Sequence, residues 1–192
     1  FTTQREVTVR TLLNHTSGLE HLGPALRQQL LPDDPVPTMA QILRGAAPAR
    51  SGPVGSVTVP GATFAYSSAG YEVLQQLIAD VAGRPFDRYT EEEVLLPLGM
   101  TDSTFTQPLP ESLRERSATA HYSGGTPVPR RSDSIPEMAV AGLWTTPTDL
   151  AKYIIRIQDA LEGRNGDLLN QQMVQAMLTP GLANRGLGPV IS

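Results

Sequence analysis

The segment FAYSSAGYEVLQQLIADVAG, residues 64–83, is the most regularly patterned part of this 192-residue chain. Its apolar side chains recur at helical spacing and fall on one face: Tyr71, Val73, Leu74, Leu77, Ile78 and Val81. Ser67 or Ser68 stands where a helix is capped, and Gly83 stands where one ends. We therefore expect a long amphipathic helix that shares one core with shorter helices around it.

Tyr66 directly precedes this helix, and its position supports two interpretations. A free phenol has a pKa of about 10, so it acts as a base near neutral pH only where neighbouring cations stabilise the phenolate. In such surroundings Tyr66 could take a proton from a serine hydroxyl and return it to a leaving group. Alternatively, Phe64 and Tyr66 alternate onto a core face ahead of the serine cap. Spacing alone leaves both interpretations open.

The rest of the pattern is also mainly helical. Further helices are predicted at 8–19 with a stop at Gly18, at 38–44, from Pro85 with a capping box at Thr90 and Glu93, from Thr146 to Gly163, and at 170–178. The segments 45–61 and 106–137 are rich in proline and glycine and are predicted to be loops. Only SATAHY, residues 117–122, suggests a short strand. No internal repeat or domain boundary is evident, so a single domain is expected.

Composition excludes several classes of function. The chain carries 19 carboxylates against 15 basic residues, which argues against a nucleic-acid partner. No apolar run approaches the roughly 20 residues that span a bilayer, and FTTQREVTVR at 1–10 lacks the apolar core of a signal peptide. The absence of cysteine excludes disulfides, thiolate nucleophiles and cysteine-based zinc sites.

The three histidines do not suggest a metal site. His15, His21 and His121 show no helical ligand spacing, and no glycine-rich phosphate loop occurs, so neither a metal nor another cofactor is expected. His15, in NHTSGL, could be a general base, or it could bind the terminal carbonyls of the preceding helix. Trp144 is more typical of a core anchor than of a binding platform.

Four ordered motifs carry a family resemblance: VTVRTLLNHTSGL, PGATFAYSSAGYEVLQQLIADVAGRPF, LLPLGMTDSTF and IPEMAVAGLWTTPTDLAKYI. Together they resemble the serine hydrolase family of class C β-lactamases, D-alanyl-D-alanine carboxypeptidases and related esterases, from residue 7 to about residue 180. In that family, the serine of a Ser-x-x-Lys motif is acylated, a Tyr-x-Asn or Tyr-Ser-x motif follows, and Lys-Thr-Gly or His-x-Gly lies near the C-terminus. The resemblance places Tyr66, Ser67 and Ser68 at the second motif.

The first motif of the family is absent from these residues, and the third is absent from its expected place near the C-terminus, since the one His-x-Gly is HLG at 21–23. Lys152 is the only lysine, and Asp149 stands three positions before it, so no Ser-x-x-Lys occurs. The resemblance thus implies an internal segment of a longer hydrolase, with residues 1–192 forming a single, incomplete β-lactamase-like domain. The implied fold class is mainly α with long loops, the helical region of the β-lactamase/transpeptidase-like α+β fold, with most of the antiparallel sheet missing.

The resemblance implies a serine acyl hydrolase in the intact protein, acting through an acyl-enzyme on a small-molecule or peptide ester or amide, with this chain alone inactive. Tyr66 would be the general base or proton relay. Ser68, where many members have asparagine, would contact substrate or support the lysine network, and Gly142 and Trp144 would line the cleft with the loops 45–61 and 106–137. The shorter hydroxyl weakens the case for a β-lactamase and leaves esterase or peptidase activity open.

Two alternatives stay open. One is a non-catalytic helical binding or structural domain that retains the hydrolase scaffold. The other is an incomplete gene product, which would expose apolar surface where the sheet should pack. Many members of the family are exported, but neither the compartment nor the oligomeric state of this protein can be predicted from these residues.

Overall fold

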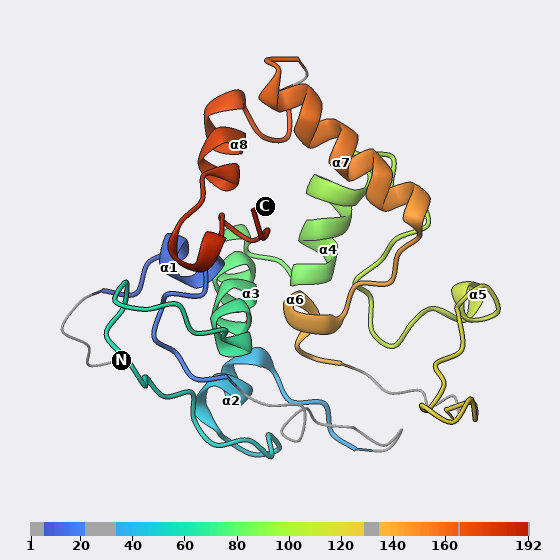
Figure 1. Ribbon diagram of the computed structural model, residues 1–192. Helices are drawn as coiled ribbons and strands as arrows, with labels where there is room; N and C mark the ends of the chain where they lie inside the picture. Colours follow the sequence, from blue (N-terminus) through green and yellow to red (C-terminus); the bar gives the residue numbers. More distant parts are fainter. Residues whose placement is uncertain (1–5, 22–33, 129–134, 165, 192) are drawn as a thin grey trace.

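The computed structural model describes residues 6–21, 34–128, 135–164 and 166–191. Figure 1 shows helices joined by long irregular segments, with α3 near the middle. In chain order the helices are α1 (Val9–Leu13), α2 (Met39–Arg44), α3 (Ser68–Ala82), α4 (Phe86–Thr90), α5 (Glu111–Arg114), α6 (Met138–Ala141), α7 (Pro147–Leu161) and α8 (Gln171–Leu178). A π-helical turn, Glu91–Leu95, continues α4, and a short 3-10 turn, Leu182–Asn184, follows α8. Within the described ranges, no helix combines the length and the apolarity needed to cross a membrane.

The helix α3 begins and ends as the sequence predicts. The Ser67 hydroxyl accepts the backbone N–H of Gly70, and Gly83 ends the helix in the left-handed conformation. The helices α1, α2, α4 and α6 pack against α3 (Figure 1). Leu12 of α1 and Leu74 of α3 meet in the core cluster at this centre, together with Leu19, Val54 and Ala69.

The helices α7 and α8 form a second packed pair. Ile157 and Ala160 of α7 bury their side chains against Val174 of α8. A third cluster, formed by Leu95, Leu98 and Met100, follows α4. The ring of Tyr153 packs against both of these clusters, so this one side chain joins the α7–α8 pair to the segment after α4.

The loop 45–61 is attached to the segment that follows α1. The Gly18 carbonyl accepts hydrogen bonds from Val57 N–H at 2.7 Å and from Thr58 N–H at 3.3 Å. The Glu20 carboxylate accepts the Gly55 N–H at 2.6 Å. Gly18 has φ +72°, and a Cβ there would stand 2.1 Å from the Thr58 carbonyl oxygen. This contact therefore requires glycine.

The described residues form helices and no sheet. Among the described residues there is no strand of a sheet, only isolated antiparallel bridges such as Leu19 to Ser56 and His121 to Pro127. Residues 117–122 make only the His121 bridge and do not form the expected strand. The described part of the chain thus contains none of the family's antiparallel sheet, most of which was expected to be missing, because no two of its extended segments pair beyond a single bridge.

Two helix boundaries also differ from the prediction. The helix α1 ends at Leu13 and not at Gly18, because His15 adopts a left-handed backbone with φ +57°. The predicted capping box at Thr90 is wrong, since the chain stays helical from Phe86 through Leu95. Thr90 lies inside this run, and its hydroxyl donates to the Phe86 carbonyl at 2.9 Å. The starts of α2, α7 and α8 agree with the prediction to within a residue.

Candidate active site

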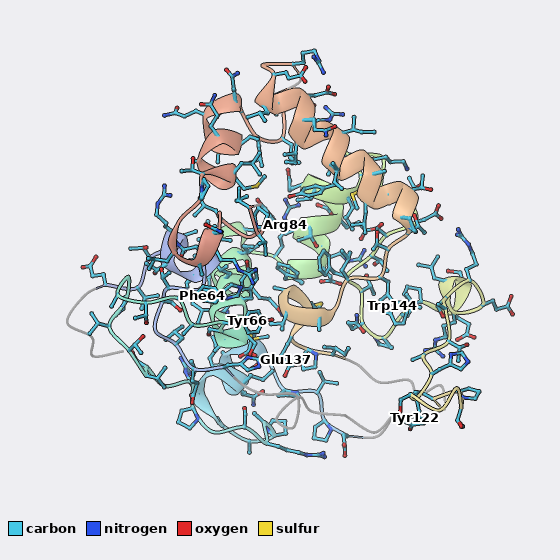
Figure 2. All side chains as sticks on the ribbon, viewed as in Figure 1. Phe64, Tyr66, Arg84, Tyr122, Glu137 and Trp144 are labelled. Atoms are coloured by element: carbon cyan, nitrogen blue, oxygen red, sulfur yellow. The ribbon has the colours of Figure 1, made fainter. Side chains whose placement is uncertain are left out.

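Tyr66 stands on the last extended residues before α3, with 48% of its surface exposed. Figure 2 shows it beside the N-terminal end of α3, near Phe64. The interpretation that Tyr66 is buried on a core face therefore does not hold. A half-exposed phenol in front of a packed helix is open to a reacting group.

His15 fixes the backbone on both sides of Tyr66. Its Nδ1 accepts the N–H of Ser67 at 3.2 Å, and its carbonyl accepts the N–H of Ala65 at 2.9 Å. The imidazole also packs against the phenol, with the ring centroids 4.6 Å apart. The His15 backbone N–H donates to the Leu12 carbonyl at 3.3 Å, but its imidazole makes no hydrogen bond to the described carbonyls at the end of α1, and its contacts restrict where the Tyr66 ring can point.

The imidazole of His15 is buried, and it acts here as a hydrogen-bond acceptor. Burial lowers the pKa of His15 first, and the positive charge of Arg185 lowers that pKa further. A neutral ring is also what the Ser67 bond requires, because protonated Nδ1 could only donate. Burial, charge and hydrogen bonding thus all favour the neutral form.

Other aromatic and basic side chains complete the surroundings of Tyr66. His21 meets the phenol edge-on, with centroids 5.0 Å apart. Tyr71 packs against His15 and donates its hydroxyl to the Leu13 carbonyl at 3.0 Å, and burial raises the pKa of this second phenol. Arg185 lies over the face of Phe64 at 5.3 Å. The sequence pointed to His15 but gave no sign of Arg185, which is distant along the chain.

The two serines after Tyr66 differ in their roles. Ser67 is the helix cap, and its hydroxyl also donates to the Glu20 carbonyl at 2.8 Å. Ser68 is the first residue of α3 and is buried. A direct contact between Ser68 and a substrate would therefore need an approach from inside the fold.

Trp144 lies apart from Tyr66, whereas Gly142 belongs to the end of a helix that packs against α3. Gly142 ends α6, and its carbonyl accepts a hydrogen bond from the Gln107 side chain at 2.8 Å. Trp144 is exposed and exchanges two backbone hydrogen bonds of 2.9 Å with Thr104. Figure 2 shows Trp144 beyond α6, on the side of α5, and not beside Tyr66. The structure therefore brings Tyr66 together with His15 and His21, and it does not bring Trp144 to them.

The sequence profile of a known family, described as Beta-lactamase, matches residues 2–189. The chain belongs to the Beta-lactamase family. The family resemblance seen in the sequence is confirmed. Proteins of this family that resemble the chain include penicillin-binding proteins, carboxypeptidases and an acyltransferase.

Two curated relatives illustrate the range of the Beta-lactamase family. Monacolin J acid methylbutanoyltransferase of Aspergillus terreus is 29% identical over 190 residues, which are 94% of this chain and 44% of the relative. The D-alanyl-D-alanine-carboxypeptidase/endopeptidase AmpH of Escherichia coli (strain K12) is 28% identical over 95 residues, 50% of this chain and 23% of the relative. The chain thus spans less than half the length of these relatives.

A solved structure corrects the fold class. The octameric penicillin-binding protein homologue from Pyrococcus abyssi superposes with a TM-score of 0.66 at 27% identity, over 91% of this chain and 39% of that one. The chain therefore has the β-lactamase/transpeptidase fold of this family, and the mainly α fold class predicted from the sequence is wrong. The residues described here are helical in content, but helical content alone does not define the fold class.

The only lysine of this chain makes its contacts within the fold and away from Tyr66. Lys152 lies on α7, where its ammonium donates to the Asp149 carboxylate at 2.7 Å and to the Gly99 carbonyl. Neither contact involves Tyr66. Among the described residues, no group of three or more histidine, aspartate or glutamate side chains is arranged to hold a metal ion.

Proposed function

We propose that the protein containing this chain is a serine acyl hydrolase that works through an acyl-enzyme, with Tyr66 as general base or proton relay. The proposal is carried by one observation: Tyr66 is half-exposed while the backbone on each side of it is bonded to His15. Such a phenol is both accessible and restricted in orientation, as proton transfer requires. Membership of the Beta-lactamase family, with acyltransferase and carboxypeptidase relatives, supports the same reaction class.

In this mechanism the Tyr66 oxygen accepts the proton of a serine hydroxyl as that serine attacks the substrate carbonyl. The proton then passes to the leaving group, and a water or an alcohol resolves the acyl-enzyme. A phenol with a pKa near its usual value of about 10 needs a nearby cation to act as a base. The proposed source is the lysine of a Ser-x-x-Lys motif, because Lys152 is engaged with Asp149.

The remaining site residues have proposed roles in the same cleft. The burial of Ser68 favours support of the lysine network over direct contact with an ester or amide substrate. Gly142 and Trp144 are proposed to line a more distant part of the cleft wall. We also propose that residues 1–192 form one incomplete β-lactamase-like domain.

The chain alone is expected to be catalytically inactive, because it contains no Ser-x-x-Lys. Incubation with a fluorophosphonate probe should leave the purified 192-residue chain unlabelled, while a family carboxypeptidase in the same experiment is labelled. A burst of p-nitrophenol from a p-nitrophenyl ester should likewise be absent. Stoichiometric labelling of the isolated chain would contradict the proposal.

The role of Tyr66 is tested in a protein that joins this chain to a Ser-x-x-Lys segment. Tyr66→Phe should lower kcat/KM by about 10²–10⁴-fold, the usual contribution of a positioned acid or base. Tyr89→Phe is the matched control, because Tyr89 is also a partly exposed tyrosine but lies on α4, outside the loops expected to line the cleft. Equal activity of the two variants would remove Tyr66 from the mechanism.

A non-catalytic binding domain is the second candidate. It is favoured by the engagement of the only lysine with Asp149 and by the absence of Ser-x-x-Lys from these residues. This candidate requires that the complete protein also lack an acylated serine. Intact-mass measurement of the complete protein after probe treatment separates the two, since only the hydrolase gains the mass of the probe.

A further inference from the structure

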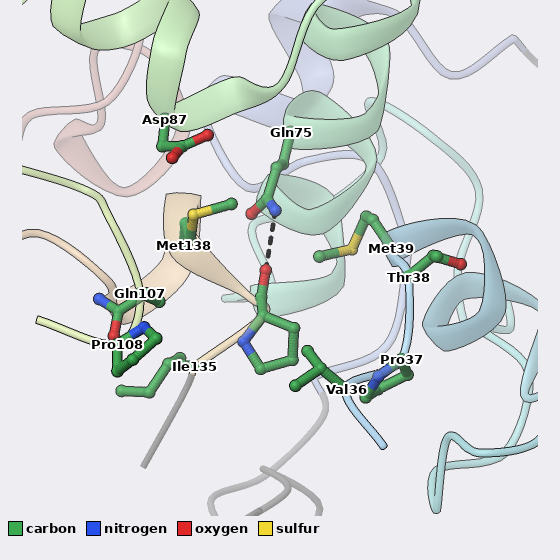
Figure 3. Close-up of a pocket in the computed structure, with 11 residues that line it drawn as sticks. Val36, Pro37, Thr38, Met39, Gln75, Asp87, Gln107, Pro108, Ile135 and Met138 are labelled. Atoms are coloured by element: carbon green, nitrogen blue, oxygen red, sulfur yellow. Dashed lines mark hydrogen bonds between the residues drawn. The ribbon is translucent and has the colours of Figure 1, made fainter. Parts of the chain in front are cut away.

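A cavity of about 490 Å³ lies between α2, α3, α4 and α6. Its walls are mostly apolar and include Val36, Met39, Ile135, Met138 and three prolines. Figure 3 shows Met39 and Met138 pointing toward the cavity from opposite sides of the hydrogen bond between Gln75 and Pro136. Tyr66, Ser68, Gly142 and Trp144 do not line it, so the cavity is separate from the proposed catalytic residues.

The size and lining of this cavity suit a small organic molecule. Ligand pockets commonly enclose about 300–1,000 Å³ and combine apolar walls with a few polar groups that orient the ligand. The two methionine side chains are flexible and polarisable, so they can adapt to the shape of an apolar group. The chemical class of the ligand then depends on the polar atoms that remain unused.

Most polar side chains around the cavity already have partners within the fold. Thr38 exchanges hydrogen bonds with Gln41 in the cap of α2. Gln75 donates to the Pro136 carbonyl at 2.8 Å and accepts the Ala139 N–H at 2.9 Å. Gln107 donates its amide nitrogen to the Gly142 carbonyl, which orients the amide and leaves its oxygen as an acceptor.

Asp87 is the exception. It is half-buried at the α4 end of the cavity (Figure 3), and its carboxylate makes no hydrogen bond or ion pair with any described residue. The neighbouring cations are already paired: Arg84 binds Glu92 and Glu93, and Arg88 binds Glu91 at 3.3 Å. The cavity thus offers a carboxylate without a described counter-charge.

We propose that this cavity binds a small organic cation, an ammonium group attached to an apolar body. The lining keeps two unused acceptor groups, the Asp87 carboxylate and the Gln107 amide oxygen, and the charge on Asp87 favours a ligand with a charged hydrogen-bond donor. A positive charge complements Asp87, and the apolar body fills the space between Met39 and Met138. An anionic ligand of the same shape would be repelled by the carboxylate.

The position of Asp87 in the first turn of α4 is also favourable for a carboxylate, whatever the cavity binds. That effect stabilises the helix but does not distinguish one ligand from another. Ligand selectivity therefore separates a binding role of Asp87 from a purely structural one.

The test uses the 192-residue chain with isotope-labelled methionine methyl groups, observed by NMR. The probes are 2-phenylethylammonium, its neutral analogue 2-phenylethanol and the anion 3-phenylpropionate. The ammonium should saturably shift the methyl signals of Met39 and Met138, while those of Met100, Met173 and Met177, which do not line the cavity, stay unchanged. Its affinity should exceed that of 2-phenylethanol by about tenfold, as expected for hydrogen bonds to a charged acceptor, and 3-phenylpropionate should bind most weakly.

Asp87→Asn should bring the affinities of the ammonium and the alcohol to within about twofold of each other. Asp80→Asn is the matched control, because Asp80 is exposed on α3 and does not line the cavity, and this variant should keep the selectivity. Equal affinity of the two probes in the unaltered chain would overturn the proposal without reference to any variant. Unchanged selectivity in Asp87→Asn, or shifts at all five methionines alike, would also overturn it.

Discussion

At the scale of single residues, His15 determines how Tyr66 is held. The left-handed backbone of His15 ends α1 and turns its imidazole toward the segment before α3. The ring accepts the Ser67 N–H, and Arg185 and His21 are the basic groups around it. Protonation would replace the acceptor lone pair with a donor and add a positive charge near Arg185, so the Ser67 bond cannot survive it.

His15 therefore makes the stability of the protein depend on pH. Its folded pKa lies below the ordinary 6.5, so the unfolded chain binds more protons between these two values. Stability should be fully present above about pH 6.5 and should fall as the pH is lowered toward the folded pKa, by at most about 1.4 kcal/mol per pH unit. Thermal unfolding between pH 8 and pH 5.5 measures this change.

Variants assign that pH dependence to His15. In His15→Asn the slope near pH 6 should disappear, because asparagine tolerates a left-handed backbone and can accept the Ser67 N–H without titrating. In His121→Gln the slope should persist, because His121 is exposed and remote from this site. A His15→Asn protein with an unchanged slope would show that another group titrates.

The sequence predicted the residues of this site unevenly. Tyr66, Ser67 and His15 were recognisable because they belong to local motifs, and Ser67 does cap α3. Their contact was not predictable, because the bond between His15 and Ser67 joins residues 52 positions apart. Arg185 and Asp87 lie outside the four motifs, so only the folded chain shows what they are close to.

At the scale of elements, the start of α7 is correctly predicted, but its first turn also binds another segment of the chain. Thr146 caps the helix and Pro147 occupies its first position, as the sequence indicates. Asp149, however, turns its carboxylate away from the cap and toward the turn after Met100. It accepts Asp102 N–H at 2.9 Å and the Ser103 hydroxyl at 2.8 Å, and it pairs with Lys152.

Asp149→Asn should therefore destabilise the protein by about 2–3 kcal/mol, because a buried charged acceptor with several donors is lost. Lys152→Met should cost only about 0–1 kcal/mol, since the lysine side chain is 39% exposed and Asp149 keeps its bonds from Asp102 and Ser103. Urea unfolding of the two variants measures both values. Equal losses would mean that the ion pair alone matters and that the Ser103 and Asp102 bonds do not.

The pH dependence of Asp149 runs in the acid range. Burial acts to raise the pKa of Asp149, but hydrogen bonds from Lys152, Ser103 and Asp102 outweigh it and hold that pKa below its ordinary value. The stabilisation is present above the unfolded pKa of about 3.8 and is lost as the pH falls through the lower folded value. The Asp149 effect therefore lies below pH 3.8, whereas the His15 effect begins near pH 6.5.

The helix α3 shows what periodicity can and cannot predict. Its boundaries follow from the cap and the final glycine, yet its apolar face is only partly covered. Leu74 is buried, whereas Val81 is 80% exposed, and Glu72 and Gln75 are buried in its place. Periodicity indicates which side chains share a face, and the neighbours that cover that face are set by the rest of the fold.

At the scale of the whole molecule, the α7–α8 pair is linked to the other helices through few side chains. Tyr153 packs in both clusters that meet there, and Asp149 and Lys152 bind the segment 99–103. Several large apolar residues of α7, among them Ile154 and Ile155, are exposed. We expect this pair to open separately from α3 under native conditions.

Tyr153→Ala should lower the free energy of opening of the α7 and α8 amides by about 3 kcal/mol and leave the α3 amides less affected. Native-state hydrogen exchange measures these free energies one amide at a time. Tyr153→Phe is the control, because it keeps the ring that both clusters contact. A uniform loss over all helices in Tyr153→Ala would show that the molecule unfolds as one unit.

Gly18 has a consequence for how this chain tolerates sequence change. Any side chain at this position meets the Thr58 carbonyl and forces the loop 45–61 away from the segment after α1. Tyr66, by contrast, is half-exposed and can be replaced with little effect on folding. In a library selected only for folded protein, glycine should remain at position 18 while position 66 accepts many residues. Selection for folding should therefore constrain position 18, and only selection for activity should constrain position 66.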